Sequence, residues 1–205
     1  VDMPNTFPLG PAYLLFVTDA GDTQSETDET NNFRAVAIDV VAPDLSVTGA
    51  TGPAQAVSHE VITVTWTVAN GGTVDTVAPW WRDWVHLSTT DDEIGIFDFM
   101  GAVTQAAYAP LAGGSQYTHT ATFTVPHCPA GQYYMIFETD HYREQGERDE
   151  TNNIFALPLA VSVPDLSIPV ATATDIAAFG QSVDVSWTVS NNAASPAMGD
   201  WYDAL

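Results

Sequence analysis

The stretch Glu147–Asn153 (ERDETNN) occurs twice in this chain, and its earlier copy is Glu26–Asn32 (ETDETNN). The copies are 121 positions apart, counted from residue 26 to residue 147. The same separation relates two further pairs of segments, namely PDLSV (43–47) with PDLSI (164–168), and VITVTWTV (61–68) with SVDVSWTV (182–189). A repeat of this length predicts a tandem array of similar domains.

The repeat also predicts the domain boundaries. Residues 1–42 should be the C-terminal part of one repeat, with its last two strands. Residues 43–163 should be a complete domain of ordinary size, and residues 164–205 the N-terminal part of the next repeat. The segments 41–42 and 162–163 lead directly into the PDL motifs, so we expect very short linkers and touching neighbours. The flanks would be completed by neighbouring repeats or by identical chains placed end to end.

The composition is strongly acidic. The chain has 26 Asp and Glu against 4 basic residues, all of them Arg, and a net charge of −22. Nucleic acid and anionic membranes are poor partners for such a surface, because binding them relies on basic side chains. The charge instead attracts divalent cations. No stretch is long and apolar enough to predict a membrane-spanning helix. Cys128 is the single cysteine, so it has no partner within the chain, and we expect it in the core.

Alternation of apolar and polar residues predicts an all-β fold. In the segment 61–68, Ile62, Val64, Trp66 and Val68 share one face and three threonines share the other. Similar runs, separated by Gly-rich turns, predict strands near residues 44–50, 60–69, 81–89, 97–104, 115–125, 131–140 and 153–162. About seven strands in a repeat of this length fit an immunoglobulin-like β-sandwich.

Several motifs in this order resemble the CARDB family. They are PDLSV (43–47), VTWTVANGG (64–72), WRDWVHLS (81–88), GQYY (131–134) and the DETNN ending (149–153). That family comprises bacterial and archaeal extracellular immunoglobulin-like modules related to cell adhesion. The resemblance spans the central repeat and both partial flanks. It implies a secreted or cell-surface location and a non-catalytic role, without naming a ligand.

The acidic connection between the last two predicted strands is the first candidate site. Calcium prefers about six to eight oxygen ligands from a flexible loop, and this connection is rich in carboxylates and amides. In an immunoglobulin fold it lies at the same end as the start of strand 81–89, where Asp83 is expected to point toward the core, and near Asp44. The candidate calcium ligands are Asp83, Asp140, Glu147, Asp149, Glu150 and Asn152.

The alternative is a solvated acidic turn without a metal. In that interpretation Thr151 and the neighbouring Asn residues form hydrogen bonds within the turn, and Asp83 accepts hydrogen bonds from backbone amides. Arg143 and Arg148 would neutralise part of the charge, although the earlier copy has Asp22 and Thr27 at these positions.

A second, weaker metal candidate lies in the acidic segment before and within strand 97–104. Its members, Asp91, Asp92, Glu93 and Asp98, surround Gly95. We expect it at the opposite end of the sandwich, where it would face the next domain of an array. A charged turn without a metal is the alternative.

Two tryptophans are candidates for ligand binding. Trp80 and Trp84 could stack on sugar rings or form a contact patch if they are exposed. The five histidines show no spacing typical of metal ligands, and the chain has no nucleophile elbow, phosphate-binding glycine loop or zinc cysteine pair. We therefore expect no enzyme.

The sequence thus predicts a non-catalytic extracellular protein that forms a stalk or filament of adhesive repeats, with calcium at the junctions. The alternative is a module that binds carbohydrate or protein and is attached to a secreted enzyme or adhesin. The expected partners are neighbouring repeats, identical chains, glycans or other surface proteins.

Overall fold

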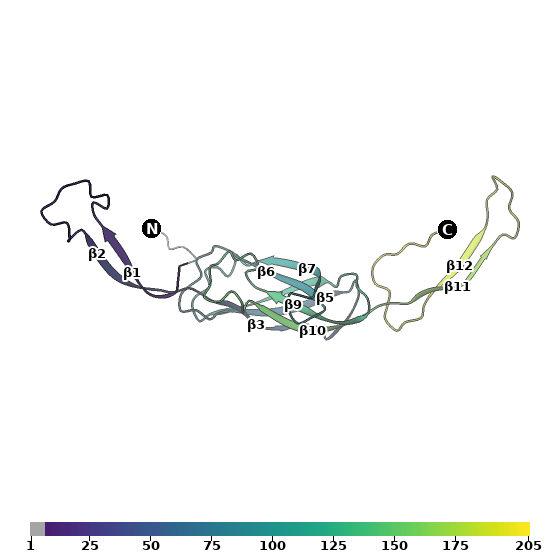
Figure 1. The fold of residues 1–205 in the computed structure, drawn as a ribbon. Coiled ribbons are helices and arrows are strands. Elements are labelled where there is room, and N and C mark those ends of the chain that lie inside the picture. The colour runs from purple at the N-terminus through teal and green to yellow at the C-terminus, as the bar shows by residue number, and fades with distance from the viewer. Residues whose placement is uncertain (1–6) are drawn as a thin grey trace.

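The computed structural model describes residues 7–205. These residues form strands and loops only, and they contain no helix that could cross a membrane. The chain has three parts in a row (Figure 1). A hairpin of β1 (Gly10–Val17) and β2 (Phe33–Val40) precedes a central sandwich, and a hairpin of β11 (Leu166–Ala173) and β12 (Val185–Asn191) follows it. The first six residues of the predicted 1–42 segment lie outside the described part.

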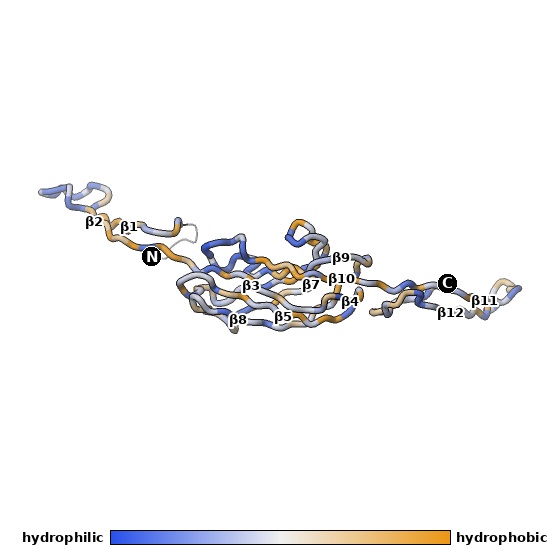
Figure 2. The backbone as a smooth tube through the Cα atoms, turned by 90° about the horizontal axis from the view of Figure 1, so that it is seen from below, coloured by the Kyte–Doolittle hydropathy of each residue, from blue (hydrophilic) through white to orange (hydrophobic). Residues whose placement is uncertain are grey.

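The central sandwich consists of two sheets. One has the order β3 (Leu45–Thr51), β5 (Val61–Asn70), β8 (Gln116–Thr124). In Figure 2, β5 and β8 run along the lower side of the sandwich. The other has the order β4 (Gln55–Val57), β10 (Ile154–Ser162), β9 (Gly131–Glu138), β6 (Arg82–Ser88), β7 (Ile96–Thr104). The seven predicted strands are all present, each with ends within two residues of the expected ones, and the all-β class is confirmed. The short β4, which pairs in parallel with β10, was not predicted.

The core lies between the two sheets and follows the alternation of β5. Ile62, Val64, Trp66 and Val68 are buried, whereas the threonines of the other face meet those of β8. Thr65 and Thr67 lie 2.8 and 3.0 Å from Thr120 and Thr118, measured between hydroxyl oxygens. Cys128 is buried, as expected. One face of this sheet therefore builds the core and the other forms a hydroxyl-lined surface.

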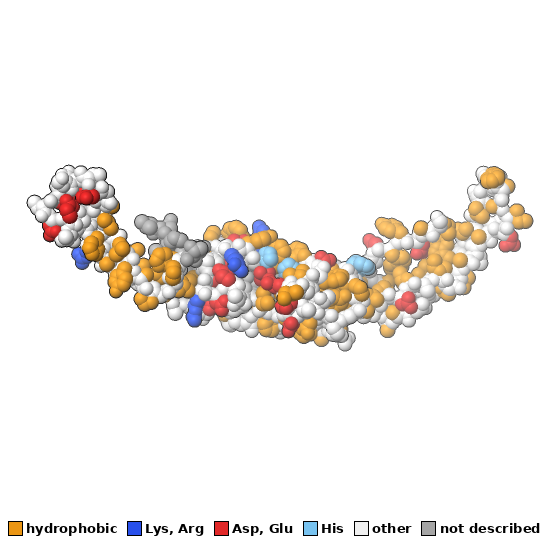
Figure 3. All heavy atoms as spheres, viewed as in Figure 1, with side chains coloured by type: hydrophobic (Ala, Val, Ile, Leu, Met, Phe, Trp, Pro, Cys, Tyr) orange, Lys and Arg blue, Asp and Glu red, His pale blue; other side chains and the backbone are white. Residues whose placement is uncertain are grey.

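The flanking hairpins have the same pairing as their counterparts 121 positions away. Gly10 pairs with Val40 in β1–β2, as Gly131 pairs with Val161 in β9–β10. Leu166 pairs with Asn191 in β11–β12, as Leu45 pairs with Asn70 in β3–β5. Unlike the central strands, both hairpins expose their apolar side chains, which line the two arms in Figure 3. Within residues 7–205, nothing packs on them as a second sheet.

Candidate functional site

The loop between β9 and β10, which we call the F–G loop (residues 139–153), lies at the end of the sandwich where the chain enters from β2. Its Arg148 amide donates to the Pro43 carbonyl (2.8 Å), and the Leu45 amide donates to Glu147 Oε2 (3.3 Å). Asn152 Nδ2 donates to Asp44 Oδ1 (3.2 Å). The expected meeting of Asp44 with this loop is therefore observed, and the loop is fastened to the linker between the first hairpin and the sandwich.

Carboxylates of the F–G loop hold its backbone in shape. Asp140 has a positive φ of 49° and accepts hydrogen bonds from the amides of Glu144 (2.9 Å) and Gln145 (3.0 Å). Asp149 accepts from the amide and hydroxyl of Thr151, which hold the pKa of Asp149 below its usual range. The metal-free alternative predicted hydrogen bonds by Thr151 within the turn, and these are observed.

The same hydrogen bonds occur in the earlier copy of the loop. Asp19, with a φ of 41°, accepts from the amides of Thr23 and Gln24, and Asp28 accepts from Thr30. The repeat therefore specifies a loop conformation. Two aspartates hold it in each copy, and of these only Asp149 and Asp28 lie within the repeated string.

Five oxygen atoms in the F–G loop are buried and accept no hydrogen bond. They are one side-chain oxygen each of Glu144, Glu147, Glu150, Asn152 and Asn153. All are potential metal ligands and none is a donor, so the loop concentrates acceptors that the described chain does not satisfy. Buried acceptors without partners are costly unless a donor or a cation meets them.

The pKa shifts of the loop carboxyl groups also favour a bound cation. Burial, followed by its contact with Glu144, raises the pKa of Asp140 to about 8. Burial and the charges of Asp140 and Glu150 raise the pKa of Glu147 to about 9. Arg143 lies 3.6 Å from Glu150, but its side chain is 70% exposed, so solvent screens this pair strongly. The loop therefore concentrates acidic groups whose ionised forms the protein does little to stabilise.

Asp83 occupies a different environment from the loop carboxylates. It is 1% exposed and points into the core, as expected. Its Oδ2 accepts from three groups and its Oδ1 from one, all at 2.8 Å; the donors are Trp66 Nε1, Gln105 Nε2, Tyr117 Oη and Thr139 Oγ1. Burial raises its pKa. The donors are side chains rather than the backbone amides of the metal-free alternative.

The network at Asp83 joins the two sheets, since Trp66 and Tyr117 belong to the sheet opposite Asp83. In the last hairpin Trp187 Nε1 donates to Asp203 in the same way (2.8 Å). Calcium ligation by Asp83 stays a prediction, and the geometry supports a structural role because both carboxylate oxygens already accept hydrogen bonds.

The second acidic cluster is divided by the structure. Asp92 accepts from the Thr90 hydroxyl (2.6 Å) and the Ile94 amide (3.0 Å), and Asp98 accepts from its neighbour Phe99. Asp91 is exposed. Glu93 instead lines a cavity of about 300 Å³ that is shared with residues of the F–G loop. The expected location of Glu93 at the opposite end, facing the next domain, is therefore wrong, because the loop between β6 and β7 brings it back over the sheet.

The two candidate tryptophans do not form one open platform. Trp84 is half-buried and stacks on His141, with ring centroids 3.9 Å apart and planes at 18°. Trp80 is exposed, and the Arg82 guanidinium lies 5.5 Å from its ring centroid. A sugar ring could reach Trp80, whereas one face of Trp84 is already covered by protein.

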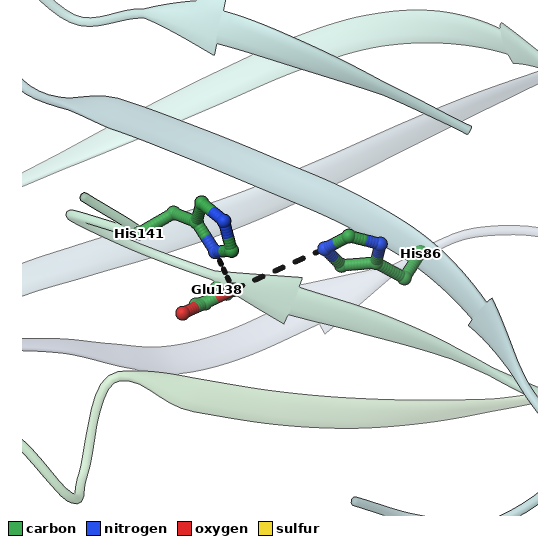
Figure 4. A group of neighbouring side chains, drawn as sticks. All are labelled: His86, Glu138 and His141. Carbon is green, nitrogen blue, oxygen red and sulfur yellow. Dashed lines mark hydrogen bonds and ion pairs between the residues drawn. The ribbon is translucent and has the colours of Figure 1, made fainter. Parts of the chain in front are cut away.

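Beside Trp84 the structure assembles His86, Glu138 and His141 (Figure 4). His141 Nδ1 contacts Glu138 Oε2, and His86 Nε2 lies 3.9 Å from the same oxygen. One potential ligand atom from each residue lies within 4.8 Å of the others. His86 comes from β6, Glu138 ends β9 and His141 begins the F–G loop, so three segments contribute to one cluster.

Comparison with known proteins identifies the domain. The sequence model of the CARDB family matches residues 42–157, which is more than half of the chain. The protein belongs to the CARDB family. A search of curated proteins found no match.

Among solved structures, similar chains include a CARDB domain from Pyrococcus furiosus, described in complex with di-metal ions. It is 20% identical, with a TM-score of 0.44, and the match covers 60% of this chain and 94% of that one. A solution structure of the same domain gives 20% identity and a TM-score of 0.41, covering 58% and 95%. A β-glucosidase from Listeria innocua is 12% identical, with a TM-score of 0.36, covering 62% and 17%.

The CARDB match begins at the linker and ends within β10, so it includes the F–G loop, Asp83 and the histidine cluster. Sequence reasoning missed the last of these, because it looked for metal-ligand spacing along the chain. A signal was nevertheless present: Glu138 and His141 are three residues apart. Strand pairing sets Trp84 opposite Glu138 and His86 opposite Ile136, which places His86 two residues along from Glu138's partner and on the same face.

Proposed function

We propose that this CARDB protein is a non-catalytic, extracellular module of a linear adhesive array. Residues 1–42 and 164–205 would be parts of neighbouring repeats around the complete domain 43–163. One observation carries the proposal: two hairpins leave opposite ends of the sandwich (Figure 1), each with the strand register of its counterpart in the central domain. Their exposed apolar faces suit completion by further strands of the same kind, from the same chain or from an identical one.

The junctions support this arrangement. Pro43 and Asp44 of the linker 41–44, and Leu45 at the start of β3, are bonded to the F–G loop. The loop therefore constrains the entry angle of the preceding repeat. At the other end, Leu166 and Trp201 of the last hairpin segment line a cavity of about 550 Å³ with His59 and Cys128 of the sandwich. Touching neighbours with short linkers favour a rod over a flexible string.

Calcium at the F–G loop is the second part of the proposal. The unsatisfied oxygens of Glu147, Glu150 and Asn152, together with Asp140, are hard oxygen ligands of the kind that calcium prefers. Asp149 is exposed, and its hydrogen bond with Thr151 shapes the loop. Because the loop is bonded to the linker, an ion here would stiffen the junction between repeats. The large negative charge of the chain suits a calcium-containing exterior.

Small-angle X-ray scattering on chains with two, three and four copies of the 43–163 repeat tests the array. We expect the maximum dimension to increase by a constant step with each repeat, and the step to persist with calcium present. A dimension that grows only as a compact globule would refute the rod. If glycan or protein capture instead depends on Trp80, the binding-module alternative replaces the structural one.

A further inference from the structure

The cluster of His86, Glu138 and His141 takes only His141 from the F–G loop and uses different ligand chemistry from the proposed calcium site. We propose that it binds one divalent ion of the zinc class, and that Glu93 completes the site from the loop between β6 and β7. The inference goes beyond the proposed array function and does not depend on it, since it rests on side chains of the central domain alone.

His86 provides the strongest evidence. Its side chain is buried, with 5% of the residue exposed, yet neither ring nitrogen has a hydrogen-bond partner. A buried imidazole ordinarily has at least one partner, and here Nε2 faces the Glu138 carboxylate at 3.9 Å (Figure 4). Trp84 and Phe99 cover the ring, with centroids 5.3 and 5.7 Å away, so water has little access. A metal ion at Nε2 would satisfy one of the two unpartnered nitrogens.

The carboxylates support the same conclusion. Glu93 and Glu138 line one cavity of about 300 Å³, together with His141. Two carboxylates that face one cavity repel each other when both are ionised, unless a cation lies between them. Arg143 also lines this cavity, but it lies 3.6 Å from Glu150 and its side chain is 70% exposed.

The ligand set favours zinc over calcium. Two neutral imidazoles and carboxylates are typical zinc ligands, at about 2.0–2.2 Å from the ion in a tetrahedron, whereas calcium selects oxygen ligands alone. Imidazoles bind metals in their neutral form, and the buried position of His86 favours that form. Ligand atoms within 4.8 Å of one another are close to the spacing of about 3.3 Å that such a tetrahedron requires. Small side-chain rotations would bring the ligand atoms to this spacing.

The site is particular to the central domain. At the positions 121 residues earlier, Glu138 and His141 are replaced by Val17 and Ala20. The aspartates that shape the F–G loop are retained in both copies. The cluster therefore does not belong to the framework of the repeat, which is the pattern expected of a site added to one domain. Bound zinc would connect β6, the end of β9 and the loop that carries Glu93.

Isothermal titration of the whole chain with zinc chloride, after removal of metals by a chelator, tests the site. We expect one zinc ion per chain that excess calcium does not displace, and visible absorption bands of a tetrahedral ion when cobalt replaces zinc. His141→Asn should weaken binding at least tenfold, since removal of even an outer-shell partner costs about that much. Glu93→Gln should weaken it as well.

His127→Asn is the matched control, because His127 stacks on His59 at a ring distance of 5.4 Å in the other histidine pair of the described chain. Its zinc affinity should equal that of the unchanged chain. His141 is partly exposed, and an unchanged melting temperature in the metal-free state would show that His141→Asn still folds. Absence of binding, or binding that is lost in His127→Asn and retained in His141→Asn, would overturn the proposal. Unchanged affinity in Glu93→Gln would remove Glu93 from the ligand set.

Discussion

Replacing Asp83 by Ala should remove a large fraction of the stability of the central domain. Asp83 lies between the sheets and accepts four hydrogen bonds, from Trp66, Gln105, Tyr117 and Thr139. The substitution would leave four buried donors without an acceptor. Each unsatisfied group costs about 1–3 kcal/mol, but the costs are not additive, because water can enter the space and the burial penalty of the carboxylate disappears.

We therefore expect a loss of about 3–5 kcal/mol, the range found when one partner of a buried charged network is removed. Since domains are stable by about 5–15 kcal/mol, this is a large fraction of the total. At about 4 °C per kcal/mol for a domain of this size, the melting temperature should fall by about 12–20 °C. Urea unfolding followed by tryptophan fluorescence measures the free energy, and circular dichroism measures the melting temperature.

Two further variants test the reasoning. Thr139→Val removes a single donor and should cost about 1–2 kcal/mol, whereas Asp98→Ala, at an exposed carboxylate, should change stability by less than about 0.5 kcal/mol. If Asp83→Ala costs no more than Asp98→Ala, the four hydrogen bonds do not hold the sheets together and the argument fails.

Three further predictions concern the loop and the packing. Calcium at about 100 times its dissociation constant should stabilise the domain by about 2.7 kcal/mol, and Glu147→Gln should abolish this shift in calorimetric melting; an equal shift in the variant would exclude Glu147 as a ligand. Burial raises the folded-state pKa values of Asp140 to about 8 and Glu147 to about 9. The metal-free domain should therefore lose stability as pH rises from about 4 toward 9, and calcium should reduce that loss. Stability that increases across this range would contradict the raised pKa values of these two carboxyl groups. Gly101→Ala would place a Cβ 2.4 Å from the Phe123 ring and should cost about 1–3 kcal/mol in urea unfolding, so a neutral result would show that the ring moves aside freely.

The strands could be predicted because their signal is local. In β5 alternating residues are buried, and the period of two requires no knowledge of the partner strands. The short β4 (Gln55–Val57) has only three residues, too few for a pattern to appear. It forms because β10 offers a free edge beside it, and that edge is known only once the sheet is assembled.

The candidate site was predictable to a lesser extent. The string Glu147–Asn153 identifies the loop, and its repetition identifies Asp149, one of the two aspartates that shape it. The position of Glu93 depends on how the loop between β6 and β7 folds back. The alternation of apolar and polar residues does not specify this. The cover over Trp84 depends likewise on His141 arriving from the F–G loop. Both are consequences of tertiary packing and could not be read from spacing along the chain.

Comparison of the two copies of the F–G loop separates what belongs to the repeat from what belongs to this domain. Asp19 and Asp140 make the same pair of amide hydrogen bonds, and the side-chain oxygens of Asn32 and Asn153 are both buried without a partner. The unsatisfied asparagine oxygen is therefore a feature of both copies of the loop. This is expected if an ion binds at every junction. By contrast, the positions of Glu138 and His141 hold Val17 and Ala20 in the earlier copy. The two metal proposals thus make opposite claims about the array: calcium should act at each junction that completes the loop, whereas zinc should be confined to domains that carry the histidine cluster.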